Sequence, residues 1–212
     1  MSTSNKLPKG TLVLFISFAL LLFAVFLLQQ PKQSNIPKDL IAVMRPHMMP
    51  LKTFTLIDHN EQDFKNINLK NKWSFVFFGY THCPDICPTT LVTLKHIYKT
   101  LKKHPQASAN MQVIFVSVDP ERDKAKDLGS YVKYFNKEFI ALTGSTKTIN
   151  DFSKQFSAAY FKEKPTAPGE YLVSHASSIF LVNPETGIVA SFSPPHDSET
   201  IVEQYLKIHG MF

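Results

Sequence analysis

Residues 73–91 read WSFVFFGYTHCPDICPTTL. The stretch opens with a run of apolar and β-favouring residues, WSFVFF, which is typical of a central strand that is buried on both faces. Gly79 follows, and the next loop holds the only two cysteines of the chain, Cys83 and Cys87. Pro88 suits the first turn of a helix, where no backbone N–H is needed. The stretch therefore predicts a buried strand, a loop with both thiols, and a helix that begins at the second thiol.

The rest of the chain alternates between strand and helix patterns. Apolar residues at helical spacing predict helices, and short runs of β-branched and aromatic residues predict strands. We expect helices at residues 89–101, 123–135, 150–160 and 198–207, and strands at residues 54–56, 73–78, 113–118, 139–142, 178–182 and 188–192. This order favours an α/β fold of the thioredoxin type, a sandwich in which helices flank a central β-sheet.

The composition is that of a globular protein, with 212 residues of which 44% are hydrophobic and 19% are charged. The net charge of +6 is unevenly placed, because residues 1–50 hold five basic residues and one acidic residue, whereas residues 51–212 hold 18 and 16. A basic segment beside an apolar one suits a membrane surface. No cluster of Lys and Arg interleaved with aromatic residues follows it in the sequence, so we do not expect nucleic-acid binding.

The N-terminal segment contains an apolar stretch, LVLFISFALLLFAVFLL at residues 12–28, without any charge. Such a stretch can cross ~30 Å of hydrocarbon as a helix. A cleaved signal peptide is the alternative, but its apolar region is usually ~7–15 residues long and ends at a small-residue site. We therefore expect a tail at residues 1–11, a single transmembrane helix at residues 12–28, a linker at residues 29–50 and the folded domain at residues 51–212.

The charges that flank this stretch do not fix its orientation, because basic residues lie on both sides of it. A short tail before a first span usually stays inside, which places the domain outside. The start of the chain lacks the Arg-rich amphipathic pattern of a mitochondrial presequence. We expect a protein of the bacterial inner membrane whose domain faces the periplasm.

The two cysteines indicate chemistry rather than a structural framework. Two cysteines in a chain of this size do not make a disulfide scaffold, and a bridge between Cys83 and Cys87 would close only a small loop. Backbone N–H groups at a helix start favour negative charge, so they lower a thiol pKa and populate the thiolate. Such a thiolate can attack a disulfide or bind a soft metal ion, and the spacing alone does not choose between these outcomes.

Three ordered motifs resemble the Sco/SenC family of copper proteins. They are FFGYTHCPDICPTTL at residues 77–91, VDPERD at residues 118–123 and YLVSHAS at residues 171–177. The resemblance extends over residues 50–209 and implies a thioredoxin-like fold, with the N-terminal membrane anchor that is typical of the family. It also implies that Cys83, Cys87 and His175 bind one copper ion, as Cu(I) or Cu(II).

The donor set agrees with this resemblance, because two thiolates and one imidazole suit copper, whereas zinc prefers four ligands or three and a water. Asp119 has two interpretations: a turn residue that caps the following helix, or a carboxylate that orients His175 through its second ring nitrogen. Members of the family often carry Asp before the histidine, where this chain has Ser174. We expect this difference to weaken or retune the site without removing a ligand.

Other side chains that suit copper lie nearby or in the linker. His82 is adjacent to Cys83, but neighbouring side chains often diverge. His47, Met48 and Met49 offer imidazole and thioether groups. The simpler interpretation is that this part of the linker packs against the domain.

The resemblance implies a copper metallochaperone that supports assembly of the binuclear copper centre of cytochrome c oxidase. Its partners are then the oxidase subunit that carries this centre and a thiol reductant that prepares the cysteines for loading. The same thiols also fit a membrane-anchored thiol–disulfide oxidoreductase that keeps the oxidase cysteines reduced, or a peroxidase. We expect a monomer that acts as a chaperone rather than as an enzyme, with the oxidoreductase activity as the open alternative.

Overall fold

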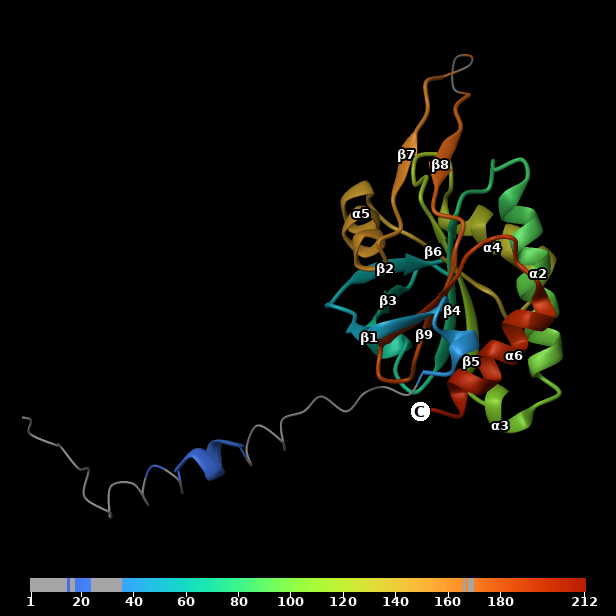
Figure 1. Cartoon of the computed structure of the whole chain (residues 1–212). Coiled ribbons are helices and arrows are strands. Elements are labelled where there is room, and N and C mark those ends of the chain that lie inside the picture. Colours follow the sequence, from blue (N-terminus) through green and yellow to red (C-terminus); the bar gives the residue numbers. More distant parts are fainter. Residues whose placement is uncertain (1–14, 16–17, 24–35, 166, 168–169) are drawn as a thin grey trace, which may run out of the picture. The chain divides into compact units, whose positions relative to one another are not determined.

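The computed structural model describes residues 15, 18–23, 36–165, 167 and 170–212 of the chain (Figure 1). The chain divides into two units, Met1–Asn35 and Ile36–Phe212. The predicted tail at residues 1–11 and most of the predicted transmembrane helix at residues 12–28 lie outside the described residues. Within the described part, no helix is both long enough and apolar enough to cross a bilayer.

The described part of the second unit is built on a mixed sheet with the strand order β1-β10-β9-β4-β5-β6-β2-β3. The strands are β1 (Met44–Pro50), β2 (Thr55–Asp58), β3 (Asp63–Lys65), β4 (Trp73–Gly79), β5 (Met111–Ser117), β6 (Ile140–Thr143), β9 (Ile179–Val182) and β10 (Gly187–Phe192). The parallel strands β4 and β5 lie at the centre, and all their residues are buried. The prediction of a buried central strand at residues 73–78 is therefore confirmed.

Helices cover both faces of this sheet. They are α2 (Ile86–Leu101), α3 (Pro105–Ser108), α4 (Ala125–Phe135), α5 (Thr146–Gln155) and α6 (Ser198–His209), with 3-10 turns at η1 (Lys38–Leu40) and η2 (Asn66–Asn68). Successive residues of a strand point to opposite faces, so Phe75 packs against Tyr205 of α6, whereas Phe78 packs against Phe152 of α5. Figure 1 shows α2, α4 and α6 on one side of the sheet and α5 on the other. This arrangement is the α/β sandwich that the sequence predicts.

Two elements differ from the sequence predictions. The helix expected at residues 150–160 lies at Thr146–Gln155, because Ser145 caps it by accepting a hydrogen bond from the Thr148 N–H at 3.1 Å. Residues 44–50, expected as the end of the linker, form the edge strand β1, which pairs antiparallel with β10. An edge strand tolerates the two prolines of this segment because its outer side donates no ladder hydrogen bonds.

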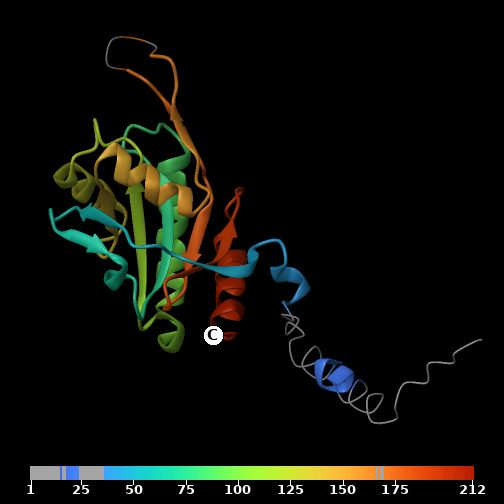
Figure 2. The ribbon, with the colours of Figure 1, turned by 90° about the vertical axis from the view of Figure 1, so that its left-hand side faces the viewer.

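A separate hairpin consists of the short strands β7 (Tyr160–Lys162) and β8 (Val173–His175). The strands are antiparallel, and Tyr160 lies opposite His175. Figures 1 and 2 show that this hairpin extends beyond one end of the main sheet. The hairpin, which the sequence patterns did not predict, carries the third of the predicted ligands.

Candidate metal centre

The loop between β4 and α2 brings both thiols to the start of the helix. The helix begins at Ile86, one residue before Cys87. The Cys87 N–H donates a hydrogen bond to Cys83 Sγ at 3.4 Å, and both thiols are free. Cys87 is fully buried, whereas 9% of the surface of Cys83 is exposed to solvent. A backbone donor at the helix start therefore faces a sulfur atom, which stabilises its thiolate.

Gly79, the last residue of β4, makes room for the second thiol. A Cβ atom at this position would lie 2.6 Å from Cys87 Sγ and 2.8 Å from Phe115 Cε2. Both distances are too short for real contacts. The close approach of the sulfur to the strand therefore requires a glycine here.

His175 joins the two thiols from a distant part of the chain. Its Nε2 atom lies 3.4 Å from Cys87 Sγ, and its Nδ1 atom lies 3.0 Å from the carbonyl oxygen of Ala176. Because a carbonyl only accepts hydrogen bonds, Nδ1 carries the proton and Nε2 turns its lone pair toward the thiols. The rings of Phe77 and Tyr80 pack edge-on against the imidazole, with centroid distances of 6.1 and 5.9 Å.

The thiols of Cys83 and Cys87 and the imidazole of His175 form one compact cluster, which we call the thiol–imidazole cluster. One ligand atom from each of the three lies within 4.8 Å of the other two. The structure thus brings together the three side chains that the motifs single out, although the histidine is 88 residues from the second cysteine.

The two thiols differ in acidity because they share one proton. A hydrogen bond from Cys87 lowers the pKa of Cys83 to about 4 against the opposing effect of burial. The same hydrogen bond, together with burial, raises the pKa of Cys87 above its ordinary value. At neutral pH the reduced pair therefore carries one negative charge on Cys83 and one proton on Cys87.

Asp123 holds the cysteine loop in place. Its buried carboxylate accepts hydrogen bonds from the Thr81 N–H at 3.0 Å, from the Thr81 hydroxyl at 2.5 Å and from the Ser117 hydroxyl at 2.7 Å. Thr81 lies two residues before Cys83, and Ser117 ends β5. The sequence patterns did not predict this role, and its only signal is the second aspartate of the VDPERD motif.

Asp119 does not contact His175. Its buried carboxylate accepts hydrogen bonds from Arg122 Nε at 2.5 Å and from the Tyr171 hydroxyl at 2.7 Å. The prediction that Asp119 orients the imidazole through its second nitrogen is therefore wrong in its direct form, because this nitrogen is bonded to the backbone of Ala176. Asp119 instead fixes Tyr171, which stands two residues before β8.

Tyr80 and Glu163 contact the strand that carries the histidine from different elements. The Val173 N–H donates a hydrogen bond to the hydroxyl oxygen of the buried Tyr80 at 3.2 Å. The Ser174 hydroxyl donates to Glu163 Oε1 at 2.5 Å. Ser174 stands where many family members have Asp. Its hydroxyl is bonded to Glu163, the residue that follows β7, and not to the thiol–imidazole cluster.

The other candidate side chains lie apart from this cluster. His82 is exposed, and its Nδ1 atom lies 3.8 Å from a carboxylate oxygen of Asp123. Met48 and Met49 lie on β1, where their sulfur atoms accept hydrogen bonds from other side chains at 3.4 and 3.3 Å. In the part of the chain that the structure describes, the thiol–imidazole cluster is the only group of three or more His, Cys, Asp or Glu side chains arranged to hold a metal ion.

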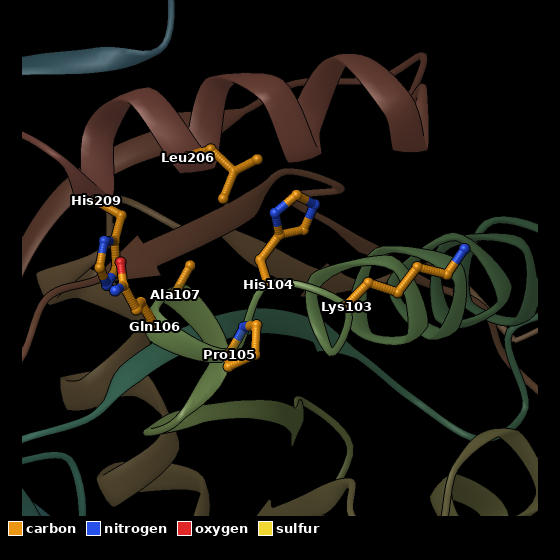
Figure 3. Close-up of a pocket in the computed structure, with 7 residues that line it drawn as sticks. All are labelled: Lys103, His104, Pro105, Gln106, Ala107, Leu206 and His209. Carbon is orange, nitrogen blue, oxygen red and sulfur yellow. The ribbon is translucent and has the colours of Figure 1, made fainter.

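A pocket of about 500 Å³ lies at the far end of α2 (Figure 3). Its lining includes two histidines, His104 and His209, and side chains from α3 and α6. Cys87 and Leu101 mark the two ends of α2, and at 1.5 Å per residue they are roughly 20 Å apart. The pocket therefore takes no part in the thiol–imidazole cluster.

Fold and cluster together define a class of protein. A thioredoxin-like α/β domain holds two thiols at a helix start, and a hairpin supplies an imidazole to them. Two sulfur donors and one nitrogen donor suit a soft metal ion in low coordination, whereas a structural zinc site needs a fourth ligand. The chain is thus a thioredoxin-like domain with the donor set of a soft-metal site.

Residues 45–209 match the SCO1/SenC family, and the chain belongs to this family. Mitochondrial SCO1 homolog 1 of Arabidopsis thaliana is 33% identical over 154 residues, which cover 73% of this chain and 45% of that protein. A protein of Stutzerimonas stutzeri described as copper-binding is 29% identical over 195 residues, 92% of this chain and 91% of that protein.

Solved structures of the family share the fold. Copper-bound ScoI of Arabidopsis thaliana has a TM-score of 0.71 and 32% identity, and the match covers 76% of this chain and 98% of that one. Copper-bound Sco1 of yeast has a TM-score of 0.70 and 29% identity, with 77% and 90% covered. The chain spans about half the length of the mitochondrial relatives, 45% for the Arabidopsis protein and 58% for SCO2 homolog of Mus musculus.

Proposed function

We propose that this chain is a copper metallochaperone that binds one copper ion through Cys83, Cys87 and His175 and supports assembly of the binuclear copper centre of cytochrome c oxidase. The observation that carries the proposal is the convergence of these three ligand atoms within 4.8 Å. The copper in the related plant and yeast structures supports copper as the metal. A related structure, BsSco, is described as a member of the Sco family of cytochrome c oxidase assembly proteins, which supports the destination.

The protonation of the cluster suits loading with Cu(I). Cys83 is a thiolate at neutral pH, and the free nitrogen of His175 carries a lone pair. Cys87 supplies the second sulfur once its proton leaves, so loading releases about one proton per ion. Three ligands leave a coordination position on the ion for an incoming ligand of the acceptor. His175 is only half buried, whereas both cysteines are buried, so the acceptor reaches the ion from the side of the histidine.

The cellular setting belongs to the same proposal. The apolar stretch at residues 12–28 is a single membrane anchor in the bacterial inner membrane, and the second unit, which begins at Ile36, is the periplasmic domain. The domain acts as a monomer, and a thiol reductant keeps its cysteines reduced before loading. The oxidase subunit that carries the binuclear copper site is the acceptor.

Anaerobic titration of the reduced protein with Cu(I) tests copper binding. We expect a stoichiometry of one ion per chain and a large loss of affinity in His175→Ala. His82→Ala is the matched control, because this exposed histidine is adjacent to Cys83 but lies outside the cluster, and its affinity should equal that of the unmodified protein. A stoichiometry near zero, or equal affinities for both histidine variants, contradicts the proposal.

Delivery is tested separately in cells that lack the gene. Oxidase activity should fall without it, and added copper should restore part of this activity. Complementation by the His82→Ala variant but not by His175→Ala links the defect to the cluster. Full complementation by His175→Ala argues against delivery as the function.

A second function, thiol–disulfide oxidoreductase, is favoured by the unequal acidity of the two thiols. Cys83, the thiolate with residual exposure, attacks a substrate disulfide, and the departing sulfur of the substrate takes up a proton. Cys87 then gives up its proton and displaces the substrate from the mixed disulfide. The domain ends oxidised with a Cys83–Cys87 bond, and the substrate ends with two thiols.

The two functions differ in their need for the imidazole. Disulfide reduction requires both thiols, so Cys87→Ser should trap a mixed disulfide on Cys83, and His175→Ala should retain most of the turnover. If turnover of a peptide with the acceptor's cysteine pair is lost in His175→Ala as completely as in Cys83→Ser, this second function is excluded.

A further inference from the structure

A basic surface lies where α2 and α4 end next to one another. The two helices contact each other, and a shallow pocket of about 460 Å³ lies between their last turns. We call this surface the lysine face, and its members are Lys95, Lys99, Lys102, Lys133, Lys137 and Tyr134. The first three share one side of α2 because residues three and four apart are neighbours on a helix. Folding thus joins two groups of lysines that are far apart in the sequence.

The lysine face is poorly neutralised. All five lysines are exposed. Among the residues that the structure describes, Lys102 alone of these five has an ion-pair partner, Glu138 at 3.5 Å. The sequence of α2 contains no Asp or Glu from Ile86 to Leu101. The charges therefore add up over one surface instead of cancelling.

Helix ends explain only part of this arrangement. A cation near a helix C-terminus interacts favourably with the helix dipole, and both helices end here. One or two lysines at each end would serve that purpose. The dipole does not explain the ring of Tyr134, which is 84% exposed beside the lysines.

The residue types indicate what kind of surface the lysine face meets. Specific recognition of a phosphate or a carboxylate favours the planar fork of Arg, and all the cations of this face are Lys, which act as point charges. Point charges spread over an open surface suit the diffuse negative potential of anionic lipid head groups. An exposed Tyr, with an apolar ring and a polar tip, suits the boundary between lipid and water.

We propose that the lysine face binds the surface of a membrane that contains anionic lipids. The proposal goes beyond copper delivery and does not depend on it. The thiols lie at the start of α2, and at 1.5 Å per residue Cys87 is about 12 Å along the helix from Lys95 and about 22 Å from Lys102. Contact through the lysine face therefore leaves the thiol–imidazole cluster free for a partner.

The experiment uses residues 36–212 without the anchor. This unit has its own hydrophobic core, and the related Arabidopsis structure consists almost entirely of the matching domain. Its binding is measured by co-sedimentation with vesicles of phosphatidylcholine that contain phosphatidylglycerol, and with vesicles of phosphatidylcholine alone. We expect binding to the anionic vesicles only, and weaker binding at high salt.

Matched variants test the surface itself. The triple variant Lys95→Gln, Lys99→Gln and Lys133→Gln should lower the partition coefficient about 100-fold, which corresponds to about fivefold per lysine. The control variant, with the same net charge, changes three exposed lysines elsewhere on the unit that have no ion-pair partner among the described residues: Lys52→Gln, Lys70→Gln and Lys154→Gln. It should keep most of the binding.

Three outcomes overturn the proposal. They are no preference for anionic vesicles, an equal loss in both triple variants, and binding to a Glu-rich peptide without binding to vesicles, which would assign the face to an acidic protein. Because no copper or anchor is present, these results leave the proposed metallochaperone function unaffected. A blue shift of the fluorescence of Tyr134→Trp on anionic vesicles gives an independent positive readout.

Discussion

The shared proton of the two cysteines makes the reactivity of each residue predictable. Cys83 has a pKa of about 4, so its thiolate persists at acidic pH, whereas the pKa of Cys87 is raised. We expect alkylation of the reduced, metal-free protein to modify Cys83 selectively, with a rate that falls as the pH drops through about 4. Peptide mapping by mass spectrometry as a function of pH measures this.

A variant of the neighbouring cysteine tests the cause of this acidity. Cys87→Ala removes the main hydrogen bond and should raise the alkylation midpoint of Cys83 strongly. An unchanged midpoint in Cys87→Ala would show that the hydrogen bond is not the cause. Exclusive modification of Cys87 would reverse the assignment of the two thiols.

A single methyl group at Gly79 should disturb the site. In Gly79→Ala the new Cβ atom would lie 2.6 Å from Cys87 Sγ, so the sulfur or the strand must shift. We expect a loss of about 2 kcal/mol in the free energy of unfolding, as is usual for overpacking, together with weaker Cu(I) binding. Chemical denaturation and copper titration measure both effects.

Gly210→Ala is the matched control for this change. A Cβ atom there would meet its nearest neighbours at an ordinary 3.6 Å. Its stability and copper affinity should stay close to those of the unmodified protein. If both alanine variants lose copper affinity equally, the tight packing at Gly79 is not what positions the sulfur.

The site residues that the sequence predicts differ in how local their signals are. The cysteine pair follows from a buried strand, a proline and a helix start within one short stretch, so elementary patterns suffice. His175 required the resemblance to a family, because nothing near it in the chain points to the thiols. Nothing near Thr81 in the sequence points to its bonds with Asp123, which is 42 residues away.

At the scale of elements, the hairpin of β7 and β8 determines where the imidazole lies. Its link to the VDPERD segment passes through the Tyr171 hydroxyl, which donates to Asp119 at 2.7 Å, and through the Arg122 guanidinium, 3.7 Å from the centroid of the Tyr171 ring. Tyr80 adds a bond to the backbone of Val173. Copper affinity should therefore depend on residues that do not contact the metal.

Tyr171→Phe removes one of these links and keeps the ring. We expect a loss of about 1 kcal/mol in stability and a several-fold lower copper affinity, because the strand that carries His175 is held less firmly. The visible spectrum of the Cu(II) form should change, since it reports the geometry of the ligands. Tyr134→Phe, on a side chain that is 84% exposed, is the control and should change neither property. An unaltered spectrum and affinity in Tyr171→Phe would mean that the hairpin is positioned without this bond.

Elements were predictable where they are long and periodic. The helices α2, α4 and α6 and the buried strands β4 and β5 all lie close to their expected ranges. The strands β7 and β8 have three residues each, too few for an alternation to be recognised. The strand β1 contains two prolines and exists because β10 offers it a partner, which is a long-range cause.

At the scale of the whole molecule, parallel strand order explains why the site forms where it does. The parallel strands β4 and β5 end at the same edge of the sheet, so the cysteine loop and the VDPERD segment emerge side by side. The hairpin closes over this edge and completes the cluster. Three segments that are remote in the sequence are thus joined at one place, which couples metal binding to the stability of the entire domain.

This coupling gives a prediction for thermal unfolding. An ion that binds the folded state alone stabilises it by about 2.7 kcal/mol at a free concentration of 100 times Kd, which corresponds to a rise of about 5–10 °C in Tm for a domain of this size. We expect this rise for the reduced protein with Cu(I) and for His82→Ala, and most of it should vanish in His175→Ala because one of the three joined segments no longer contributes a ligand. Anaerobic differential scanning calorimetry measures the shift. If Cu(I) raised the Tm of His175→Ala as much as that of the unmodified protein, the cysteine pair alone would account for the stabilisation. The hairpin would then have no part in holding the metal.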